Sequence, residues 1–340
     1  MTGFLAMRRL VRNNVPYCCK RTESGKGDET ISMGESSFTL NPLPPFSLQL
    51  TVCALRRRPN NEVDRWDGRN YSRIFVLEGK AVKVSVSRGG DIERPKLNVT
   101  TAGKSSDHKA LQSSVSSILE KMFSLKRDLR DFYSLSGKDK RLRALADRFA
   151  GVKPPRFPTV FEALVNAFSC QQVSLDLGII LLNRLSGAYG VAFAEDKTVF
   201  RAFPRPEDLA GLSPEDLRRL GFSRNKGRAI VELSEKALDG ELEIDCLEEM
   251  TDTQLVEYLL KLRGVGRWSA EYVFLRGLGR TNMFPGDDVG AQRNLQNFFG
   301  LNERPDYEKI KKITSRWQPY SGFVYFHLLL DKLKTKGYMP

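Results

Sequence analysis

The sequence predicts an α+β fold, in which a small N-terminal antiparallel β-sheet domain precedes a larger, all-helical domain. Between residues 46 and 101, apolar side chains recur with a period of two, which is typical of strands with one solvated face. From about Lys109 onward the apolar spacing becomes helical, and capping residues mark the helix starts. The chain has 340 residues, of which 41% are hydrophobic, so roughly 150 residues per domain allows two packed domains.

The first 44 residues, 1–44, are predicted to form a disordered basic tail. Five basic residues precede the first acidic residue, Glu23, and a stretch rich in Gly and Ser leads to a proline cluster at 42–45. An N-terminus that is rich in arginine and poor in acidic residues is also typical of a transit peptide. A secretory signal is excluded, because arginines interrupt the short apolar stretch.

The β-sheet domain, with a connecting helix, is predicted over residues 45–130. Two segments in which apolar residues alternate with others, residues 48–54 and 82–86, indicate strands. Between them, residues 74–77 form a short apolar run and residues 78–80 supply a turn. These segments together predict a small antiparallel sheet with one face exposed to solvent.

The all-helical domain is predicted over residues 131–340, and several of its helices carry start and stop signals. Ser213 followed by Pro214 opens one helix, and a second helix over residues 224–238 ends before Gly240. Two further helices begin with capping-box patterns, formed by Thr159 with Glu162 and by Thr251 with Gln254.

The composition excludes several classes of protein. The 54 Lys and Arg residues outnumber the 41 Asp and Glu residues, giving a net charge of +13 that favours a polyanionic partner such as nucleic acid. No apolar run approaches the roughly 18 residues that span a bilayer. The five cysteines are scattered and the chain has two histidines, so a disulfide scaffold, a zinc finger, a cysteine-ligated iron–sulfur cluster and a histidine-rich metal site are not expected.

The segment LRGVGRWSA, residues 262–270, predicts a hairpin between two helices. Gly264 and Gly266 permit positive φ and the close approach of another backbone. Because the second helix begins at once, its free amide groups and its dipole point outward at an anion. Arg263 and Arg267 flank the turn, which makes a DNA phosphate the natural ligand. The alternative is an ordinary helix–helix corner in which glycine permits tight packing.

A second segment, FPGDDV at residues 284–289, places two aspartates before a helical pattern. A helix of about a dozen residues after the hairpin runs roughly 18 Å, so the loop that follows it can return an aspartate to the hairpin. The dipole of a helix N-terminus favours an ionised carboxylate. We expect Asp287 to cap or position the turn and Asp288 to be the functional carboxylate, and the alternative is that one of them is only a cap.

Aromatic residues accompany these two segments. Trp268 and Tyr272 are four positions apart and therefore share one helix face. Trp317 and Tyr320 lie close together further along the chain. Taken singly such residues belong to a core, but beside a carboxylate and an anion-binding hairpin they favour a pocket that stacks on a base.

These segments resemble the helix–hairpin–helix DNA glycosylase superfamily, and most closely its bacterial 3-methyladenine DNA glycosylase II type. The resemblance covers the chain from about residue 46 to 337, with the helix–hairpin–helix at 253–278. It rests on the hairpin run 262–268 and the aspartate turn 284–288, and it extends to residues 167–174, 220–226 and 316–327. The resemblance implies an α+β fold whose helical domain is a glycosylase domain.

The resemblance also implies roles for individual residues. Asp288 matches the catalytic carboxylate of the family, and Trp268 with Tyr272 matches the first wall of its base pocket. Asp287 is expected at this pocket. Tyr320 falls where the alkylation enzymes carry an aromatic residue, often tryptophan, so the face of the pocket is expected to be smaller here.

Further positions are implied to contact DNA or a cation. Gln172 falls at the wedge position that fills the gap left by a flipped nucleotide, although some relatives carry an apolar side chain there. The other implied DNA contacts are Gln171, the hairpin residues Gly264, Val265, Gly266 and Arg267, and the pair Arg224 and Lys226. A monovalent cation, Na or K, is expected on the backbone carbonyl groups of Leu262 and Gly264, with no other cofactor.

Together these features predict a monofunctional DNA glycosylase for alkylated purines of the 3-methyladenine class. Trp268 stands where strand-cleaving relatives carry a lysine nucleophile, and no cysteine follows Cys246 to form the cluster found in other subfamilies. The partner is expected to be double-stranded DNA with a damaged base, bound by a monomer without a membrane and in the compartment that holds the DNA. The alternatives are a glycosylase for 8-oxoguanine, hypoxanthine or uracil, and a non-catalytic DNA-binding module.

Overall fold

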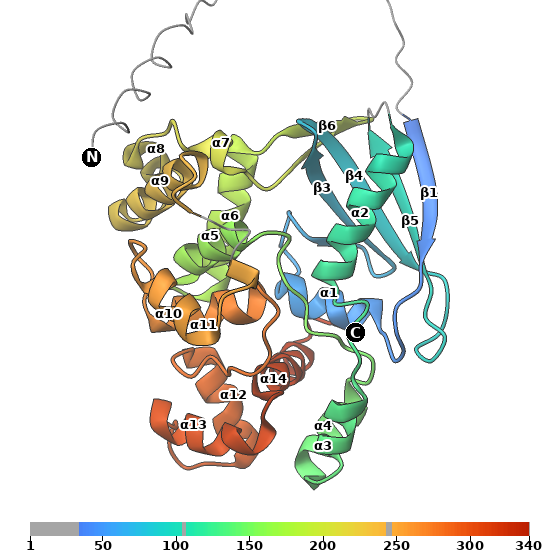
Figure 1. The fold of residues 1–340 in the computed structure, drawn as a ribbon, viewed down its shortest axis with the longest axis vertical. Coiled ribbons are helices and arrows are strands. Elements are labelled where there is room, and N and C mark those ends of the chain that lie inside the picture. Colours follow the sequence, from blue (N-terminus) through green and yellow to red (C-terminus); the bar gives the residue numbers. More distant parts are fainter. Residues whose placement is uncertain (1–33, 104–106, 243–246, 340) are drawn as a thin grey trace, which may run out of the picture. The chain divides into compact units, whose positions relative to one another are not determined.

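The computed structural model describes residues 34–103, 107–242 and 247–339. A five-stranded antiparallel sheet with the spatial order β1-β5-β4-β3-β2 comes first, and helices dominate the rest of the chain (Figure 1). The strands of this sheet are β1 (Gly34–Leu40), β2 (Arg65–Trp66), β3 (Asn70–Leu77), β4 (Lys80–Arg88) and β5 (Leu97–Gly103). The predicted fold class, an α+β protein with an N-terminal sheet and a helical remainder, is confirmed.

The helices follow and interrupt this sheet. The first of them are α1 (Leu48–Arg56), α2 (His108–Met122), α3 (Arg130–Ser136), α4 (Lys140–Arg148), α5 (Val160–Cys170), α6 (Leu175–Tyr189), α7 (Pro206–Leu209) and α8 (Pro214–Arg219). The others are α9 (Arg224–Leu238), α10 (Asp252–Leu260), α11 (Arg267–Arg276), α12 (Val289–Phe299), α13 (Tyr307–Thr314) and α14 (Ser321–Thr335). Within the described ranges, no helix is both long and apolar enough to cross a membrane.

The predicted tail over residues 1–44 is wrong in its last part. Residues 34–40 form β1, an edge strand that pairs antiparallel with β5, with Phe38 opposite Val99 and Leu40 opposite Leu97. Only every second residue of β1 is half-buried, and two of these four residues, Gly34 and Ser36, are not apolar side chains. Such a strand is specified mainly by its partner, so its own sequence carries a weak signal. Residues 1–33 lie outside the described residues.

The predicted strand at residues 48–54 is also wrong, because the segment is helix α1. Ser47 caps this helix by accepting a hydrogen bond from the amide of Leu50 at 3.4 Å. Six of its nine residues are buried. A short segment that is buried on nearly all sides shows neither a clear period of two nor one of 3.6, so periodicity does not distinguish helix from strand here.

The central hairpin and the first long helix agree with the sequence prediction. Strands β3 and β4 pair in register, and the turn between them uses Glu78 and Gly79, both with positive φ. Helix α2 lies across one face of the sheet (Figure 1). Its buried residues Leu111, Val115 and Leu119 belong to the same hydrophobic cluster as the strands. The predicted turn at residues 78–80 and the predicted start of the helix near Lys109 are therefore confirmed.

The predicted helix starts in the second half of the chain are also observed. Ser213 forms a capping box with Asp216, and Thr251 forms one with Gln254. Helix α9 has the predicted bounds. The sequence analysis missed the short hairpin of β6 (Ala192–Glu195) and β7 (Thr198–Arg201), which interrupts the expected all-helical part and packs Phe193 against Ile74 of the sheet.

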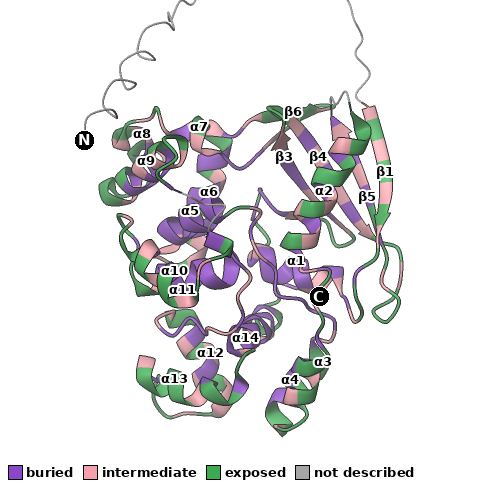
Figure 2. Cartoon of the chain, viewed as in Figure 1, coloured by how far each residue is buried: buried purple, intermediate pink, exposed green. Residues whose placement is uncertain are grey.

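The sheet and the helices share their hydrophobic core. One cluster joins β-strand residues such as Val84 and Val86 to Phe168 of α5 and Phe274 of α11. A second cluster is centred on α14, and buried residues dominate α1, α5 and α14 (Figure 2). Helix α1 contributes to both clusters. The predicted boundary between residues 130 and 131 falls at the start of α3 and does not separate two independent cores.

A buried cluster of charges ties the sheet to helix α5. Arg73 of β3 is bonded to Asp64 and to Glu162, and the hydroxyl group of Tyr71 donates to Asp64 at 2.8 Å. Thr159 caps α5 as predicted, but the Glu162 carboxylate points at Arg73, so the predicted capping box is only half formed. All three charged residues are buried, which makes each of them depend on the others.

Replacing Arg73 by methionine should lower the free energy of unfolding by about 3 kcal/mol, because it leaves two buried carboxylates without their cation. Chemical denaturation measures the change. The matched control is Arg143→Met, which removes an exposed arginine that pairs with Asp147 within α4. This control should cost less than about 0.5 kcal/mol. Equal losses in the two variants would contradict the interpretation.

Candidate active site

The predicted hairpin lies between α10 and α11. Gly264 has a φ of +80°, and a Cβ atom there would approach the Cβ of Ala229 to 3.1 Å and the ring of Phe168 to 3.3 Å. Glycine is therefore required at this position both for its backbone angle and for space. Gly266 is the N-cap of α11 and offers no capping side chain, so the first amide groups of that helix remain available to an anion.

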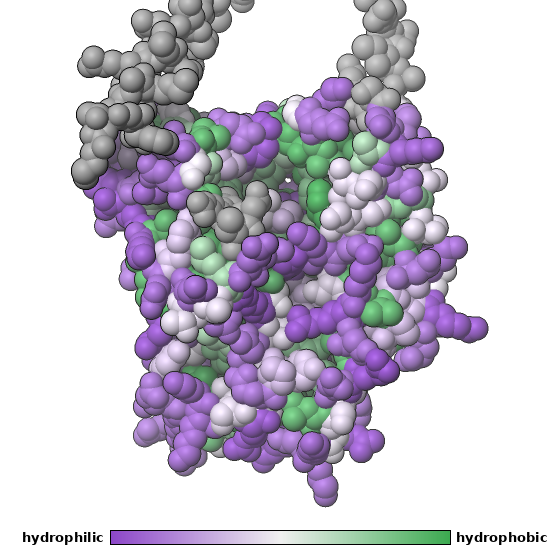
Figure 3. Space-filling view, viewed as in Figure 1, coloured by the Kyte–Doolittle hydropathy of each residue, from purple (hydrophilic) through white to green (hydrophobic). Residues whose placement is uncertain are grey.

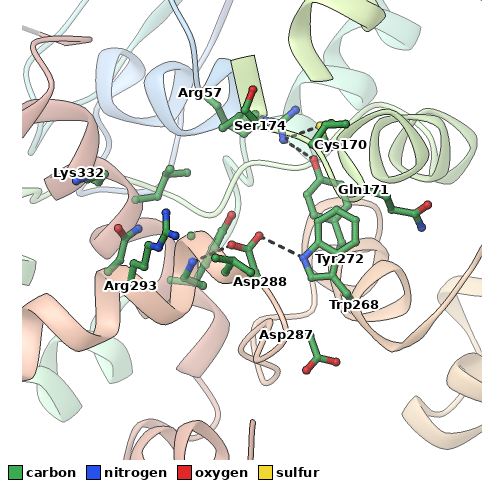
Figure 4. Close-up of a pocket in the computed structure, with 18 of the residues that line it drawn as sticks. Arg57, Cys170, Gln171, Ser174, Trp268, Tyr272, Asp287, Asp288, Arg293 and Lys332 are labelled. Carbon is green, nitrogen blue, oxygen red and sulfur yellow. Dashed lines mark hydrogen bonds between the residues drawn. The ribbon is translucent and has the colours of Figure 1, made fainter. Parts of the chain in front are cut away.

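A cleft of about 1390 Å³ lies beside this hairpin. Its walls come from the end of α1, the loop after α5, the start of α11, the start of α12 and one face of α14 (Figure 4). Among the predicted site residues, Gln171, Gln172, Gly264, Gly266, Arg267, Trp268, Tyr272, Asp287 and Asp288 line it. The fold thus brings together three segments that are separated by about 90 and 20 residues in the sequence.

Asp288 forms hydrogen bonds with residues of both α11 and α12 at the wall of this cleft. Its Oδ1 atom accepts a hydrogen bond from the amide of Ala291 at 2.8 Å and caps α12. Its Oδ2 atom accepts a hydrogen bond from the indole Nε1 of Trp268 at 3.3 Å (Figure 4). A Cβ atom on Gly290 would come within 2.9 Å of Asp288 Oδ1, so glycine makes room for the carboxylate.

The two aspartates have different roles at the cleft. Asp287 caps no helix; it forms two hydrogen bonds with Arg267, at 2.6 and 2.9 Å, at the rim of the cleft. Asp288 is both the cap and the carboxylate that faces the cleft. Of the two roles expected of Asp287, capping is not observed, because the extended backbone that precedes α12 falls one residue later, and its two bonds with Arg267 fit the positioning role.

Trp268 and Tyr272 form one aromatic wall, as their spacing predicts. Their ring centroids are 5.3 Å apart and the planes are tilted by 32°. Tyr272 is only 4% exposed, and its hydroxyl group accepts a hydrogen bond from Arg57 at 2.8 Å. Burial raises the pKa of Tyr272 well above its ordinary value, so the hydroxyl group keeps its proton.

Tyr320 does not reach the cleft. It is the N-cap residue of α14 and packs against Phe132 at a centroid distance of 5.7 Å. The aromatic residue that α14 places in the cleft is Tyr325, one turn further along. Its neighbours in the wall follow the helical period: Leu329, Lys332, Leu333 and Lys336. This helical spacing of residues 325–336 in the sequence could have predicted the second wall of the cleft.

Hydrogen bonds to two other segments hold the loop after α5, residues 171–174, in place. Gln171 donates from its side chain to the carbonyl group of Gly264 at 2.7 Å and to the hydroxyl group of Ser269 at 2.6 Å. Lys226 donates to the Gln171 carbonyl group at 2.7 Å. Gln172 is exposed at the cleft and has a φ of +52°, an uncommon conformation for a residue with a side chain. Strain of this kind clusters at functional sites.

Three predicted DNA contacts lie away from the cleft walls. Arg224 pairs with Glu215 at 3.0 Å, Lys226 supports the loop after α5, and Val265 is buried beneath the hairpin. Lys226 is thus engaged with the protein itself. Their roles as DNA contacts stay predictions.

Among the described residues, the hairpin carbonyl groups expected to bind a monovalent cation each accept one hydrogen bond. The Leu262 carbonyl accepts from the Val265 amide at 3.1 Å, and the Gly264 carbonyl accepts from Gln171 at 2.7 Å. A carbonyl oxygen has two lone pairs. One lone pair on each oxygen is therefore left for a cation, and the cation site stays a prediction.

Arg57 is the main site residue that the sequence analysis missed. It ends helix α1 with a φ of 62° and is only 3% exposed, yet it lines the cleft. Its guanidinium group donates to the Tyr272 hydroxyl group and, at 2.9 Å, to Asn166 Oδ1. Residues 48–54 were expected to form a strand, and a strand does not end in a left-handed helix cap. The sequence analysis therefore gave no reason to single out Arg57.

Glu271 holds the turn that carries the aspartates. From the buried face of α11, its carboxylate accepts hydrogen bonds from the Gly286 amide at 3.1 Å and from the Tyr307 hydroxyl group at 2.8 Å. The guanidinium group of Arg267 stacks on the Tyr307 ring at 3.8 Å and also binds Asp287. A Cβ atom on Gly286 would meet the Tyr307 ring at 2.7 Å. These contacts fix the turn, and thereby Asp288, relative to α11.

Burial raises the pKa of Glu271 from about 4.5 to about 7. A carboxyl group whose pKa is raised by folding binds its proton more tightly in the folded state, so its contribution to stability improves as the pH falls from 8 toward 5. Relative to Glu271→Gln, which cannot titrate, the wild type should gain about 2 kcal/mol of unfolding free energy over this range. Denaturation curves at several pH values test this, and parallel curves for the two proteins would contradict it.

Comparison with known proteins agrees with this geometry. Residues 165–319 match the family described as the HhH-GPD superfamily of base excision DNA repair proteins. The DNA-3-methyladenine glycosylase of Bacillus subtilis is 29% identical over 210 residues, which cover 62% of this chain and 69% of that protein. DNA-3-methyladenine glycosylase 2 of Escherichia coli is 26% identical over 308 residues, covering 89% of this chain and 99% of that protein.

A solved structure shows the same fold. The 3-methyladenine DNA-glycosylase from Archaeoglobus fulgidus superposes with a TM-score of 0.75 at 26% identity, and the match covers 86% of this chain and 97% of that chain. A glycine hairpin, an aspartate at a helix N-terminus and an aromatic wall define a protein of the helix–hairpin–helix class. Residues 165–319 are similar to the HhH-GPD superfamily of base excision DNA repair proteins, and the chain is similar to DNA-3-methyladenine glycosylases over most of its length.

Proposed function

We propose that this chain is a DNA glycosylase that hydrolyses the N-glycosidic bond of alkylated purines in duplex DNA. The observation that carries the proposal is the Asp288 carboxylate, held by Trp268 and the start of α12 at the wall of a cleft that adjoins the hairpin. The similarity to DNA-3-methyladenine glycosylases over 62–89% of the chain supports the substrate class.

The cleft fits a nucleic-acid ligand by its charge. Six basic residues line it against three acidic ones. Hydrophilic side chains cover much of the face shown in Figure 3, where apolar patches are small. Two of the acidic residues, Asp176 and Asp287, are already paired with Arg58 and Arg267. Phosphates of a DNA duplex, bound by a monomer of this chain, would be attracted to the unpaired basic groups and to the amide groups of the hairpin.

The proposed reaction follows from where the groups lie. The damaged nucleotide leaves the duplex, which costs least when its base is weakly paired, and its base stacks on Trp268 and Tyr272. Asp288 then faces the sugar, where its negative charge stabilises the oxocarbenium ion that forms as the bond to the base breaks. The carboxylate also orients the attacking water and accepts its proton.

Replacing Asp288 by asparagine should lower the rate of 3-methyladenine release at least about 100-fold, because the amide keeps the helix cap but not the negative charge. Base release from methylated DNA is measured by chromatography, and duplex affinity, expected to survive, by fluorescence anisotropy. Asp306→Asn is the matched control, since Asp306 caps α13 in the same way. Normal release by the Asp288 variant would disprove the assignment.

We also propose that the enzyme has no lyase activity. The position directly after the hairpin holds Trp268, whose indole is bonded to Asp288 and cannot form a Schiff base. Lys332 of α14 and Lys336, the residue that follows this helix, do line the cleft, and Figure 4 shows Lys332 well apart from Trp268.

Incubation with an abasic duplex and sodium borohydride tests this. We expect no covalent protein–DNA adduct, because the described lysines of the cleft, Lys332 and Lys336, belong to the wall formed by α14 and the residue after it, and Trp268 is the neighbour of Asp288. A bifunctional glycosylase provides the positive control. An adduct that forms with the wild type and is lost in Lys332→Ala would show instead that α14 supplies a nucleophile.

A further inference from the structure

One face of helix α12 lies in the cleft and is largely polar. Its members recur at the spacing of a single helix face: Gly290, Arg293, Asn294 and Asn297. The buried residue Leu295 of the same helix does not line the cleft and belongs to the hydrophobic core. Helix α12 therefore packs an apolar side against the core and turns hydrogen-bonding side chains toward the cleft.

The polar groups on this face of α12 are not engaged within the protein. The side chains of Arg293, Asn294 and Asn297 form no hydrogen bond or ion pair with any residue in the described ranges. Lys332 of α14 lines the same cleft, and its ammonium group also has no partner among the described residues. The cleft therefore holds two cations and two amides whose hydrogen-bond donors are available to a ligand.

The positive charge on this side of the cleft is not neutralised. Two of the three carboxylates that line the cleft are paired with arginines, which leaves only Asp288 among the described residues. A lone cation on a convex surface is solvated, whereas a cleft lined by charges of one sign concentrates the field and attracts an ion of the opposite sign. The ligand expected beside Arg293 and Lys332 is therefore an anion.

The groups of the cleft follow the order of the parts of a nucleotide. Figure 4 shows Trp268 and Tyr272 on one side of Asp288, and Arg293 and Lys332 on the other side. In a nucleotide the sugar joins the base to the phosphates. When the base stacks on the aromatic wall and the sugar meets Asp288, the phosphates therefore extend toward Arg293. Arg293 follows Asp288 by five residues of helix, a rise of about 7.5 Å, so both can contact one strand.

From this order we propose that Arg293 and Lys332 form a phosphate-binding site for the backbone of the strand that carries the lesion, and that the strand occupies this site only after the damaged nucleotide has left the duplex. The inference rests on the proposed glycosylase function and names a further part of its ligand. A cube with the volume of the cleft has sides of about 11 Å, less than the major groove of a duplex, which is about 12 Å wide. A single strand therefore enters the cleft, whereas a duplex does not. The guanidinium group of Arg293 offers two parallel donors to a phosphate, and Lys332 adds a point charge.

This site is compatible with a positively charged alkylated base. The base stacks on the wall formed by Trp268 and Tyr272, and Asp288 lies between that wall and the two cations (Figure 4). The bound phosphates neutralise Arg293 and Lys332, so the base meets the aromatic rings and the carboxylate. Binding energy gained on the phosphates offsets the cost of moving the nucleotide out of the duplex and holds its sugar beside Asp288.

The test compares two duplexes of the same sequence by fluorescence anisotropy. One is undamaged, and the other carries a tetrahydrofuran residue, which stands for the extruded sugar and cannot react. Arg293→Gln and Lys332→Gln should each weaken binding of the tetrahydrofuran duplex at least about fivefold and lower the slope of log K against log salt by about 1. Binding of the undamaged duplex should change less than about twofold, because its strand does not enter the cleft. The matched control is Arg143→Gln, which removes the same charge from an exposed site on α4 outside the cleft and should weaken neither complex more than about twofold.

Neutral methylphosphonates, placed one at a time in either strand of the tetrahydrofuran duplex, identify the phosphate that is bound. One position beside the tetrahydrofuran residue should weaken binding by the wild type, and at that position Arg293→Gln should cause no further loss. Equal losses for the undamaged and the tetrahydrofuran duplex, or a bound phosphate in the opposite strand, would overturn the inference. Neither result depends on base release, so the proposed function would stand. If the wild type released no 3-methyladenine from methylated DNA, the proposed function would fail instead, whatever the affinities show.

Discussion

The arrangement of the site depends on the position of one carboxylate, Asp288. The same side chain caps α12 with one oxygen and holds the Trp268 indole with the other. A change in the axis of either helix would break one of these bonds, so the aromatic wall and the negative charge keep a fixed distance. Glu271 adds a second connection, because it binds the amide of Gly286 two residues before Asp288. A site whose groups are fixed in this way needs little reorganisation when charge develops on a substrate.

The buried charges of the protein fall into two kinds. Arg73, Asp64 and Glu162 neutralise one another where the sheet meets the helices, and they serve the fold. Arg57 and Arg276 have no carboxylate partner in the described ranges and lie behind the wall of the cleft. Stability alone would favour neutral side chains at these two positions. Both guanidinium groups lie 5.8 Å from the centroid of the Tyr272 ring, and their attraction to this ring offsets part of the cost.

The parts of this site that could be predicted from the sequence are those formed by residues close together in the chain. The hairpin glycines, the spacing of Trp268 and Tyr272 and the turn before Asp288 are all determined within a few residues of one another, so patterns of spacing find them. The strand β1 could not be found, because its partner β5 lies about 60 residues away and specifies it. Helix α1 was mistaken for a strand because burial on nearly all sides removes the periodic signal.

The second half of the site depends on contacts between distant segments, and this is why Arg57 and Tyr325 escaped prediction. Arg57 reaches Tyr272 across 215 positions of sequence, and no local pattern indicates such a contact. An arginine at the end of a helix is ordinarily solvated there, since its long side chain extends to water. Here the left-handed backbone at Arg57 turns the chain back, and the side chain is enclosed between α5 and α11. Sequence therefore identifies the carboxylate of the cleft, Asp288, whereas the buried charge of Arg57 is visible only in the folded chain.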